Sequence, residues 1–481
     1  MRIRFLSVLI IAGLTLSACA STQKTTETAA GVQAVQGDKL GQDGVLDNSA
    51  SAGAVTVTGV ESAGTESLTA EHGTTKTEGV VEANGSVDST GVSGTTETGT
   101  TTIESGSTGT GESGVVTPPE PELTPVQKLV AAGDFRGARN LALADLREGK
   151  TTDSSEFWSV IEQDPLLSHT LDEEVRPHET NSISALGGGS TVSFKYKDSA
   201  DESAKAALKP DQDLRQTLYR SGIAYYRMCQ ILGCRFDIPV TRPARFSKSD
   251  FNQLYNVENT GKNRGYKGQF VHLIWANENG TQYLYVGYKE WINSFKHFPI
   301  EATNTWSPYL KNPNKEVPEL RTFLKNVLAG GRPDGVKYLN AFVEYAGDMT
   351  SRDILQQISD MILMDYLTNN WDRFAGGGPE HYGANCHFHD GGLLGIDNDA
   401  AFPPWHAPRV ERRLAMVEMF SRDLVANLRT LDPDELLLHL FPNPTKSELA
   451  SFERFKERRE SALKYIDGLI KKKGEENVLV F

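Results

Sequence analysis

The feature that most constrains how this chain can fold is a long segment without aromatic residues. Ala20 to Thr124 contains no Phe, Tyr or Trp and consists mainly of Thr, Gly, Ser, Glu, Ala and Val. Such a segment cannot bury enough apolar surface to offset the conformational entropy lost on folding. We therefore expect a disordered tether over residues 20–124 and globular structure in residues 125–481.

Most of the charge of the chain lies in this tether. The whole chain has a formal net charge of −14, and residues 20–124 hold 15 acidic and 3 basic side chains, a balance of −12. Two arginines before the tether add +2, so residues 125–481 carry only −4. A globular part this close to neutral lacks the basic surface typical of nucleic-acid-binding proteins. We expect no nucleic-acid partner.

Residues 1–19 have the pattern of an export signal. A short basic start precedes the apolar run Phe5–Leu16, which is too short for a comfortable membrane span. The run ends in Leu-Ser-Ala-Cys, which resembles the bacterial lipobox and implies that Cys19 is lipidated. Ala20 implies sorting to the outer membrane, as in enteric lipoproteins. We expect a protein of the cell envelope, held by an N-terminal lipid; the alternative is an ordinary signal peptide with a chance cysteine.

The first part of the globular region changes from helical to strand periodicity. Residues 125–180 are expected to form a helical extension, which begins with a helical hairpin broken at Gly133-Asp134. Alternating residues then predict three short strands, with the glycine turn Gly187, Gly188, Gly189 and Ser190 between the first two. A further helix and a hairpin with an Asn-Gly turn are expected after them. The predicted strands are 183–186, 191–197 and 206–210, the helix is 214–232, and the hairpin joins 270–275 to 283–288.

The second half is predicted to be mainly helical. Ser351 can cap a helix with a buried apolar face, and an Asp-Gly-Gly turn predicts a hairpin between strands 385–389 and 393–396. Amphipathic helices are expected at 410–428, 434–440 and 446–472. Among the cysteines, Cys229 and Cys234 could pair if Gly233 ends the helix between them, whereas Cys386 is expected to be buried.

Polar residues at three points suggest one chemistry. Phosphoryl transfer needs a carboxylate that orients the attacking hydroxyl, oxygen ligands for a divalent cation, and a basic residue with a glycine turn on the phosphates. Asp372 follows a buried helix and would be the base; Asn385 and Asp397 would hold the metal. Lys209, on the third strand, would bind phosphate, and backbone N–H groups of residues 187–190 would cover it.

The order of these residues resembles a known family. The run 354–402, with Asn-Trp-Asp-Arg and Ile-Asp-Asn-Asp, is similar to the secretory-pathway kinases of the Golgi casein kinase and four-jointed group. That group shares an atypical kinase fold with HipA-type and phosphatidylinositol kinases. Ala-Leu-Lys-Pro at 207–210 looks like its strand that carries the nucleotide lysine. The resemblance covers about residues 183–472.

The resemblance implies an α+β, two-lobed fold, with a small antiparallel sheet in an N-lobe (181–300) and a mainly helical C-lobe (301–481). It also implies that Lys209 contacts the nucleotide, Asp372 is catalytic and Asp397 binds Mg²⁺ or Mn²⁺. Two positions depart from the group: Phe374 stands where it has His, and Gly222 stands where a Glu should pair with the lysine. Substitutes for that Glu could be Asp211, Asp213, Glu179 or another acid.

We therefore expect an exported, membrane-tethered kinase-like protein. It would transfer phosphoryl from ATP or another nucleoside triphosphate to a hydroxyl of a protein or glycan. Alternatives are a catalytically impaired pseudokinase that acts as a tethered binding module, and a structural lipoprotein without a nucleotide site. His381, His387 and His389 lie close together in sequence and could instead ligate zinc.

Overall fold

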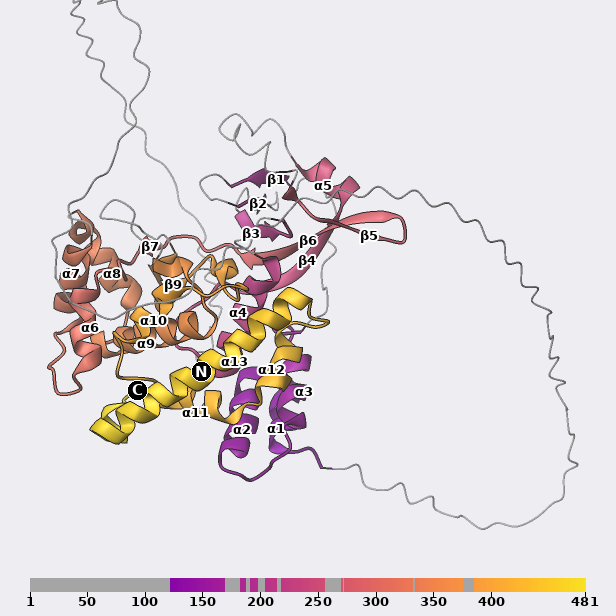
Figure 1. Cartoon of the computed structure of the whole chain (residues 1–481). Coiled ribbons are helices and arrows are strands. Elements are labelled where there is room, and N and C mark those ends of the chain that lie inside the picture. The colour runs from indigo at the N-terminus through magenta and orange to yellow at the C-terminus, as the bar shows by residue number, and fades with distance from the viewer. Residues whose placement is uncertain are drawn as a thin grey trace, which may run out of the picture. The chain divides into compact units, whose positions relative to one another are not determined.

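In the computed structural model the chain divides into two units, Met1–Gly111 and Glu112–Phe481. The structure describes residues 122–168, 182–186, 191–197, 204–213, 218–255, 270, 272–331, 334–374 and 385–481, all in the second unit (Figure 1). The predicted signal with Cys19, nearly all of the predicted tether, and the turn of Gly187, Gly188, Gly189 and Ser190 lie outside the described residues.

The described part begins with three helices: α1 (Pro125–Ala131), α2 (Phe135–Arg147) and α3 (Ser155–Gln163). The predicted helical hairpin is confirmed. Thr124 forms a capping box with Gln127, Pro125 occupies the first turn of α1, and Asp134 caps α2 through the N–H of Gly137. α2 also contacts α11 (Arg422–Thr430) (Figure 1), so these helices belong to the folded unit.

A six-stranded antiparallel sheet follows. Its strands are β1 (Ser182–Ala185), β2 (Phe194–Lys197), β3 (Ala204–Pro210), β4 (Thr241–Ser247), β5 (Trp275–Glu278) and β6 (Thr281–Glu290). The order is β1-β2-β3-β6-β4, and β5 also pairs with β6. The predicted strands over 183–186, 191–197 and 206–210 are confirmed as β1, β2 and β3. β4 was not predicted, because Pro243 interrupts its pattern; the strand lies at the sheet edge, where proline is tolerated.

The predicted Asn-Gly hairpin forms, but its first strand lies later than expected. Asn277 and Glu278 pair with Gln282 and Thr281, so the turn contains only Asn279-Gly280, with φ angles of 50° and 84°. A two-residue turn with both residues left-handed matches the twist of the flanking strands. The first strand is therefore β5, at Trp275–Glu278, and not residues 270–275.

The two faces of the sheet pack differently. Leu208, Leu284 and Val286 belong to a small core shared with Phe251 and Leu254 of α5 (Lys248–Leu254). The helix α4 (Tyr219–Leu232) contacts β4 and β6 and contributes to the larger core of the helical half. α4 therefore connects the sheet to the rest of the fold (Figure 1).

The helical half is built around α9 (Ser351–Leu367), which is buried along most of its length. Thr350, and not the predicted Ser351, caps this helix in a capping box with Asp353; the Ser351 hydroxyl donates to Pro318 O at 2.6 Å. The other helices are α6 (Thr303–Lys311), α7 (Leu320–Gly330), α8 (Leu339–Ala346), α10 (Pro408–Leu414), α11 (Arg422–Thr430), α12 (Pro433–Leu440) and α13 (Lys446–Lys473).

The helix predicted over residues 410–428 is wrong in one respect, because it is split into α10 and α11. Between them Phe420 is extended, and its N–H donates to Val478 O at 2.7 Å. Pairing with the C-terminal segment thus takes the place of helical hydrogen bonds. A second small sheet has the order β7-β8-β9, with β7 (Lys296–His297), β8 (Cys386–His389) and β9 (Gly392–Gly395), and confirms the second predicted hairpin.

The secondary structure is α+β, as predicted. Cys229 and Cys234 form a disulfide, with Cα atoms 5.2 Å apart, and Gly233 ends α4 at a φ of 77°. Cys386 is free and buried. Within the described ranges, every helix is either too short or too polar to span a membrane.

Candidate active site

Asp372 lies on a short turn that leaves the end of α9. The chain reverses at Asn369, which has a φ of 55°. The Asn369 side chain holds this reversal, because Nδ2 donates to Trp405 O at 2.6 Å and Oδ1 accepts the Ala407 N–H at 3.3 Å. The turn that follows, Asp372–Phe374, is a single 3₁₀ turn. The polar Asn-Asn-Trp-Asp-Arg segment is thus anchored to the chain around residue 406.

Arg373 links this turn to the strands that carry the other predicted site residues. Its side chain is fully buried, and Nε lies 3.2 Å from Asp365 Oδ2 on α9. Its guanidinium also donates to Asn385 O and, at 2.9 Å, to Ile396 O. A planar group with five donors can make these contacts at once. Arg373 therefore holds the residue before β8 and the residue after β9 in fixed positions relative to Asp372.

Asn385 contacts Asp372 directly. Its Nδ2 donates to Asp372 Oδ2 at 2.8 Å, while its backbone carbonyl accepts the N–H of Ile396 at 3.2 Å. Asn385 thus lies beside the residue that precedes Asp397. Asp397 has a φ of 51°, so the chain turns sharply as it leaves β9. The hairpin β8-β9 therefore brings Asn385 and Asp397 to one end of the sheet, next to Asp372.

Lys209 of β3 reaches the same place from the six-stranded sheet. Its Nζ lies 3.5 Å from Asp397 Oδ1 and 3.8 Å from Asp399 Oδ2. It also donates to Thr191 Oγ1 at 2.6 Å and to Ser193 Oγ at 3.2 Å. Only 4% of the residue is exposed to solvent. The structure thus brings Lys209, Asp372, Asn385 and Asp397 together.

Sequence reasoning missed a second lysine and a second aspartate. Lys289 of β6 is hydrogen-bonded to Asp399 Oδ2, and its Nζ lies 3.8 Å from Asp397 Oδ1. Lys209 pairs with Gly287 across the β3-β6 ladder, so Lys289 lies on the same face, two residues further along β6. The predicted strand ended at Tyr288, one residue too early for this alternation to include Lys289. Asp399 is the last residue of the Ile-Asp-Asn-Asp motif, so the sequence contained a signal that could have identified it.

Asp399 lies against α4 at the position where an acid was expected. Residue 222 is glycine, and a Cβ atom on it would overlap Asp399 Oδ1. Of the suggested substitutes, Asp213 lies 2.6 Å from His272 Nδ1, and Asp211 faces Glu448 and Arg220. Glu179 lies outside the described residues.

The charges of the site influence one another. Burial alone would lower the pKa of Lys209, but Asp397 and Asp399 raise it above its usual value. The attraction of Lys209 holds the pKa of Asp397 well below its usual range. Burial raises the pKa of Asp399, and the Lys289 ammonium opposes this rise. Burial, followed by repulsion from Asp397, raises the pKa of Asp372. Asp372 is therefore more basic than an exposed aspartate.

The oxygen atoms of the site suit a hard divalent cation. The Asp397 side chain is 43% exposed, so it is open to a ligand, whereas that of Asp399 is fully buried. No three His, Cys, Asp or Glu side chains gather into a metal-binding group in the part of the chain that the structure describes. Mg²⁺ commonly uses one or two carboxylates together with waters and substrate phosphates, so the partly exposed Asp397 carboxylate fits such an ion.

The alternative zinc ligands lie in different surroundings. His387 packs against the rings of Phe295 and His297, and His389 lies over Tyr345. His381 is outside the described residues.

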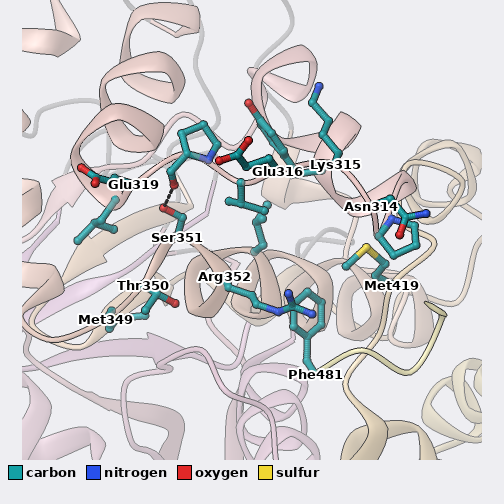
Figure 2. Close-up of a pocket in the computed structure, with 16 residues that line it drawn as sticks. Asn314, Lys315, Glu316, Glu319, Met349, Thr350, Ser351, Arg352, Met419 and Phe481 are labelled. Atoms are coloured by element: carbon teal, nitrogen blue, oxygen red, sulfur yellow. Dashed lines mark hydrogen bonds between the residues drawn. The ribbon is translucent and has the colours of Figure 1, made fainter. Parts of the chain in front are cut away.

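A separate cavity lies at the beginning of α9. It has a volume of about 690 Å³, and its walls include Lys315, Glu316, Arg352, Met419 and Phe481. Figure 2 shows these side chains together with the hydrogen bond that the Ser351 hydroxyl donates to Pro318 O. None of the residues that line this cavity belongs to the site of Lys209 and Asp397.

Comparison with known proteins gives distant structural likenesses, among them the following two. No family model and no curated protein matches the chain. A structure of hydra Fam20 with sugar is 13% identical, with a TM-score of 0.38, and the match covers 68% of this chain and 93% of that one. An aminoglycoside phosphotransferase from Alicyclobacillus acidocaldarius is 11% identical, with a TM-score of 0.16, covering 60% and 92%. At these TM-scores the function has to be argued from the site residues themselves.

Proposed function

We propose that this protein is a metal-dependent phosphotransferase with a kinase-like arrangement of catalytic groups. It transfers the terminal phosphoryl group of ATP or another nucleoside triphosphate to a hydroxyl group of a protein or glycan. The observation that carries this proposal is the distance of 3.5 Å between Lys209 Nζ, from the sheet, and Asp397 Oδ1, from the helical half. An amine and carboxylates that face each other in this way suit a triphosphate and its cation.

Asp372 is the proposed proton acceptor. Its carboxylate is oriented by the Asn385 amide at 2.8 Å, and its raised pKa favours proton uptake. The acceptor oxygen forms a bond to the terminal phosphorus as the bond from that phosphorus to the bridging oxygen breaks. The nucleoside diphosphate leaves, and the proton of the hydroxyl moves to Asp372.

Lys209 and Lys289 are the proposed phosphate-binding cations. Their ammonium groups can neutralise negative charge that develops on the leaving phosphate oxygens. Asn385 and Asp397 would hold Mg²⁺ or Mn²⁺, which neutralises further phosphate charge when bound. We also keep the prediction that Gly187, Gly188, Gly189 and Ser190 cover the phosphates. It is supported by Thr191, the next residue, whose hydroxyl accepts a hydrogen bond from Lys209.

We place this activity in the cell envelope, with Cys19 lipidated and the protein held at a membrane. The lipobox-like Leu-Ser-Ala-Cys sequence supports this placement. Incorporation of labelled palmitate into the native protein, but not into the Cys19→Ala variant, is the expected result. Equal labelling of both proteins would contradict the anchor without affecting the proposed chemistry.

Binding is the first step to test. A thermal-shift titration of the full-length protein with ATP and Mn²⁺ should raise the Tm of the native protein, and the Asp397→Ala variant should show little or no rise. Asp423→Asn, on the exposed face of α11, is the matched control and should respond like the native protein. The absence of a shift in the native protein would contradict the proposal.

Transfer of labelled phosphate to a mixture of envelope proteins and glycans then separates an enzyme from a binding module. The native protein should transfer label, and Asp372→Ala should abolish transfer while it keeps the thermal shift. ATP-dependent stabilisation without transfer to any acceptor would favour the pseudokinase alternative.

A further inference from the structure

Gly222 and Asp399 lie in contact where α4 passes the turn after β9. Gly222 is in the first turn of α4, and an ideal Cβ atom there would overlap Asp399 Oδ1. That oxygen is buried and has no hydrogen-bond partner among the described residues. Glycine is a poor helix former, so its presence inside α4 calls for a local reason. The carboxylate of Asp399 supplies that reason, because any side chain at position 222 would collide with it.

We infer that Asp399 supplies the carboxylate that holds the two site lysines, in place of an acid on α4, and that residue 222 is glycine to make room for it. The significance for nucleotide binding rests on the proposed function, whereas the contact itself does not. Asp399 is thus proposed as a positioning residue that acts through Lys209 and Lys289.

The two aspartates of the turn differ in exposure in a way that supports separate roles. The Asp399 side chain is fully buried, and its Oδ2 contacts Lys289 and lies 3.8 Å from Lys209. A buried carboxylate needs such partners, because an unpaired charge in the interior is costly. Asp397 is partly exposed and remains open to a ligand. Asp399 therefore holds the lysines while Asp397 faces the ligand.

This arrangement has a consequence for control of the site. An acid carried by a helix can be separated from its lysine when the helix moves. Here the acid lies two residues from Asp397, on the same turn after β9. The acid that contacts the lysines thus lies on the same turn as the proposed metal ligand and not on α4.

A double-mutant cycle tests the contact without any nucleotide. In the native background, Gly222→Ala should lower the Tm, because the added methyl group displaces Asp399. In the Asp399→Ala background, the same change should raise the Tm, because the collision is gone and alanine favours the helix. An equal effect of Gly222→Ala in both backgrounds would overturn the inferred fit.

Chemical labelling of lysines tests the positioning role. Acetylation followed by mass spectrometry should show Lys209 and Lys289 protected in the native protein and severalfold more reactive in Asp399→Asn, which keeps the size of the side chain but not its charge. Glu290→Ala, which removes an exposed acid next to Lys289 in sequence, should leave both lysines protected. Unchanged reactivity in Asp399→Asn would overturn the positioning role.

A third experiment tests whether an acid placed on α4 can do the work of Asp399. In the Gly222→Glu, Asp399→Ala double variant, the Cβ atom of the new side chain starts 3.6 Å from Lys289 Cε, and its carboxylate should restore protection of both lysines. Asp399→Ala alone should not. If the double variant still unfolds cooperatively but its lysines stay reactive, the inference that Asp399 takes the place of an acid on α4 is overturned. Lysine labelling needs no ATP. The absence of a thermal shift with nucleotide would therefore contradict the proposed function without affecting the labelling result.

Discussion

The ammonium group of Lys209 lies 3.5 Å from Oδ1 of Asp397, and the pair joins β3 of the sheet to the turn that follows β9. The two residues belong to separate strand systems, because β3 is in the six-stranded sheet and β9 in the three-stranded one. Their meeting is the spatial requirement of the proposed phosphoryl transfer. It also places a buried positive charge where an anionic ligand could replace part of its pairing with Asp397.

Replacement of Lys209 should weaken nucleotide binding. In Lys209→Met the phosphates lose a charged donor, which is worth about 1.5–3 kcal/mol, so the Kd for ATP should rise roughly tenfold to hundredfold. Lys195→Met is the control: this β2 lysine lies over the ring of Trp291, and its loss should leave binding unchanged. Titration calorimetry with ATP and Mn²⁺ measures both. Equal affinity of Lys209→Met and the native protein would refute the phosphate role.

Replacement of Arg373 should destabilise the fold. Lysine cannot contact Asp365 and the carbonyls of Asn385 and Ile396 together, so Arg373→Lys leaves buried groups unpaired, at a cost of about 3–5 kcal/mol. Arg422→Lys changes an exposed pair with Glu475 and should cost at most about 1 kcal/mol. Denaturant unfolding compares the two variants. Similar losses in both would mean that the buried network adds little.

Asp360 should make stability depend on pH. Burial raises its pKa to about 7, although Ser421 Oγ and the Arg235 N–H donate to its carboxylate. The folded state therefore binds a proton that the unfolded chain releases near pH 4. Stability from this group is complete below about pH 4 and falls by up to about 1.4 kcal/mol per pH unit as pH rises towards 7.

Asp360→Asn should remove that slope. Urea unfolding at several pH values between about 4 and 8 should give a flatter profile for the variant than for the native protein. The test uses the slope and not the absolute stability, because the amide has one acceptor oxygen where the carboxylate has two, one for the Ser421 hydroxyl and one for the Arg235 N–H. Parallel profiles would show that Asp360 does not take up a proton in this interval.

The N-terminal helices should be required for stability. Trp158 of α3 stacks on His439 of α12, with ring centroids 4.1 Å apart, and its Nε1 donates to Glu435 at 2.7 Å. Trp158→Ala should cost about 3–5 kcal/mol, and Trp158→Phe less, because the phenyl ring keeps most of the stacking. Denaturant unfolding measures both. An unchanged midpoint in Trp158→Ala would mean that the extension is an independent appendage.

Local patterns in the sequence predicted much of the fold. Glycine breaks and helical spacing predicted α1, α2, α9, α12 and α13, and alternation with turn residues predicted the hairpin β8-β9. These signals work because they reflect hydrogen bonding and burial within a few residues. They failed where long-range pairing decided the outcome: β4 forms against β6 despite Pro243, and the pairing of Phe420 with Val478 interrupts a helical pattern.

The types and order of the candidate groups could be predicted from the residues alone: one lysine on a strand, Asp372 after a buried helix, and Asp397 after another strand. Which of these groups meet depended on long-range contacts, and those contacts added Lys289 and Asp399 to the site. The same contacts place the Asp399 carboxylate, from the turn after β9, in the space that a side chain at position 222 would need. The physical reason is that charge pairing depends on distances of a few ångströms, whereas sequence spacing carries no information on contacts between distant segments.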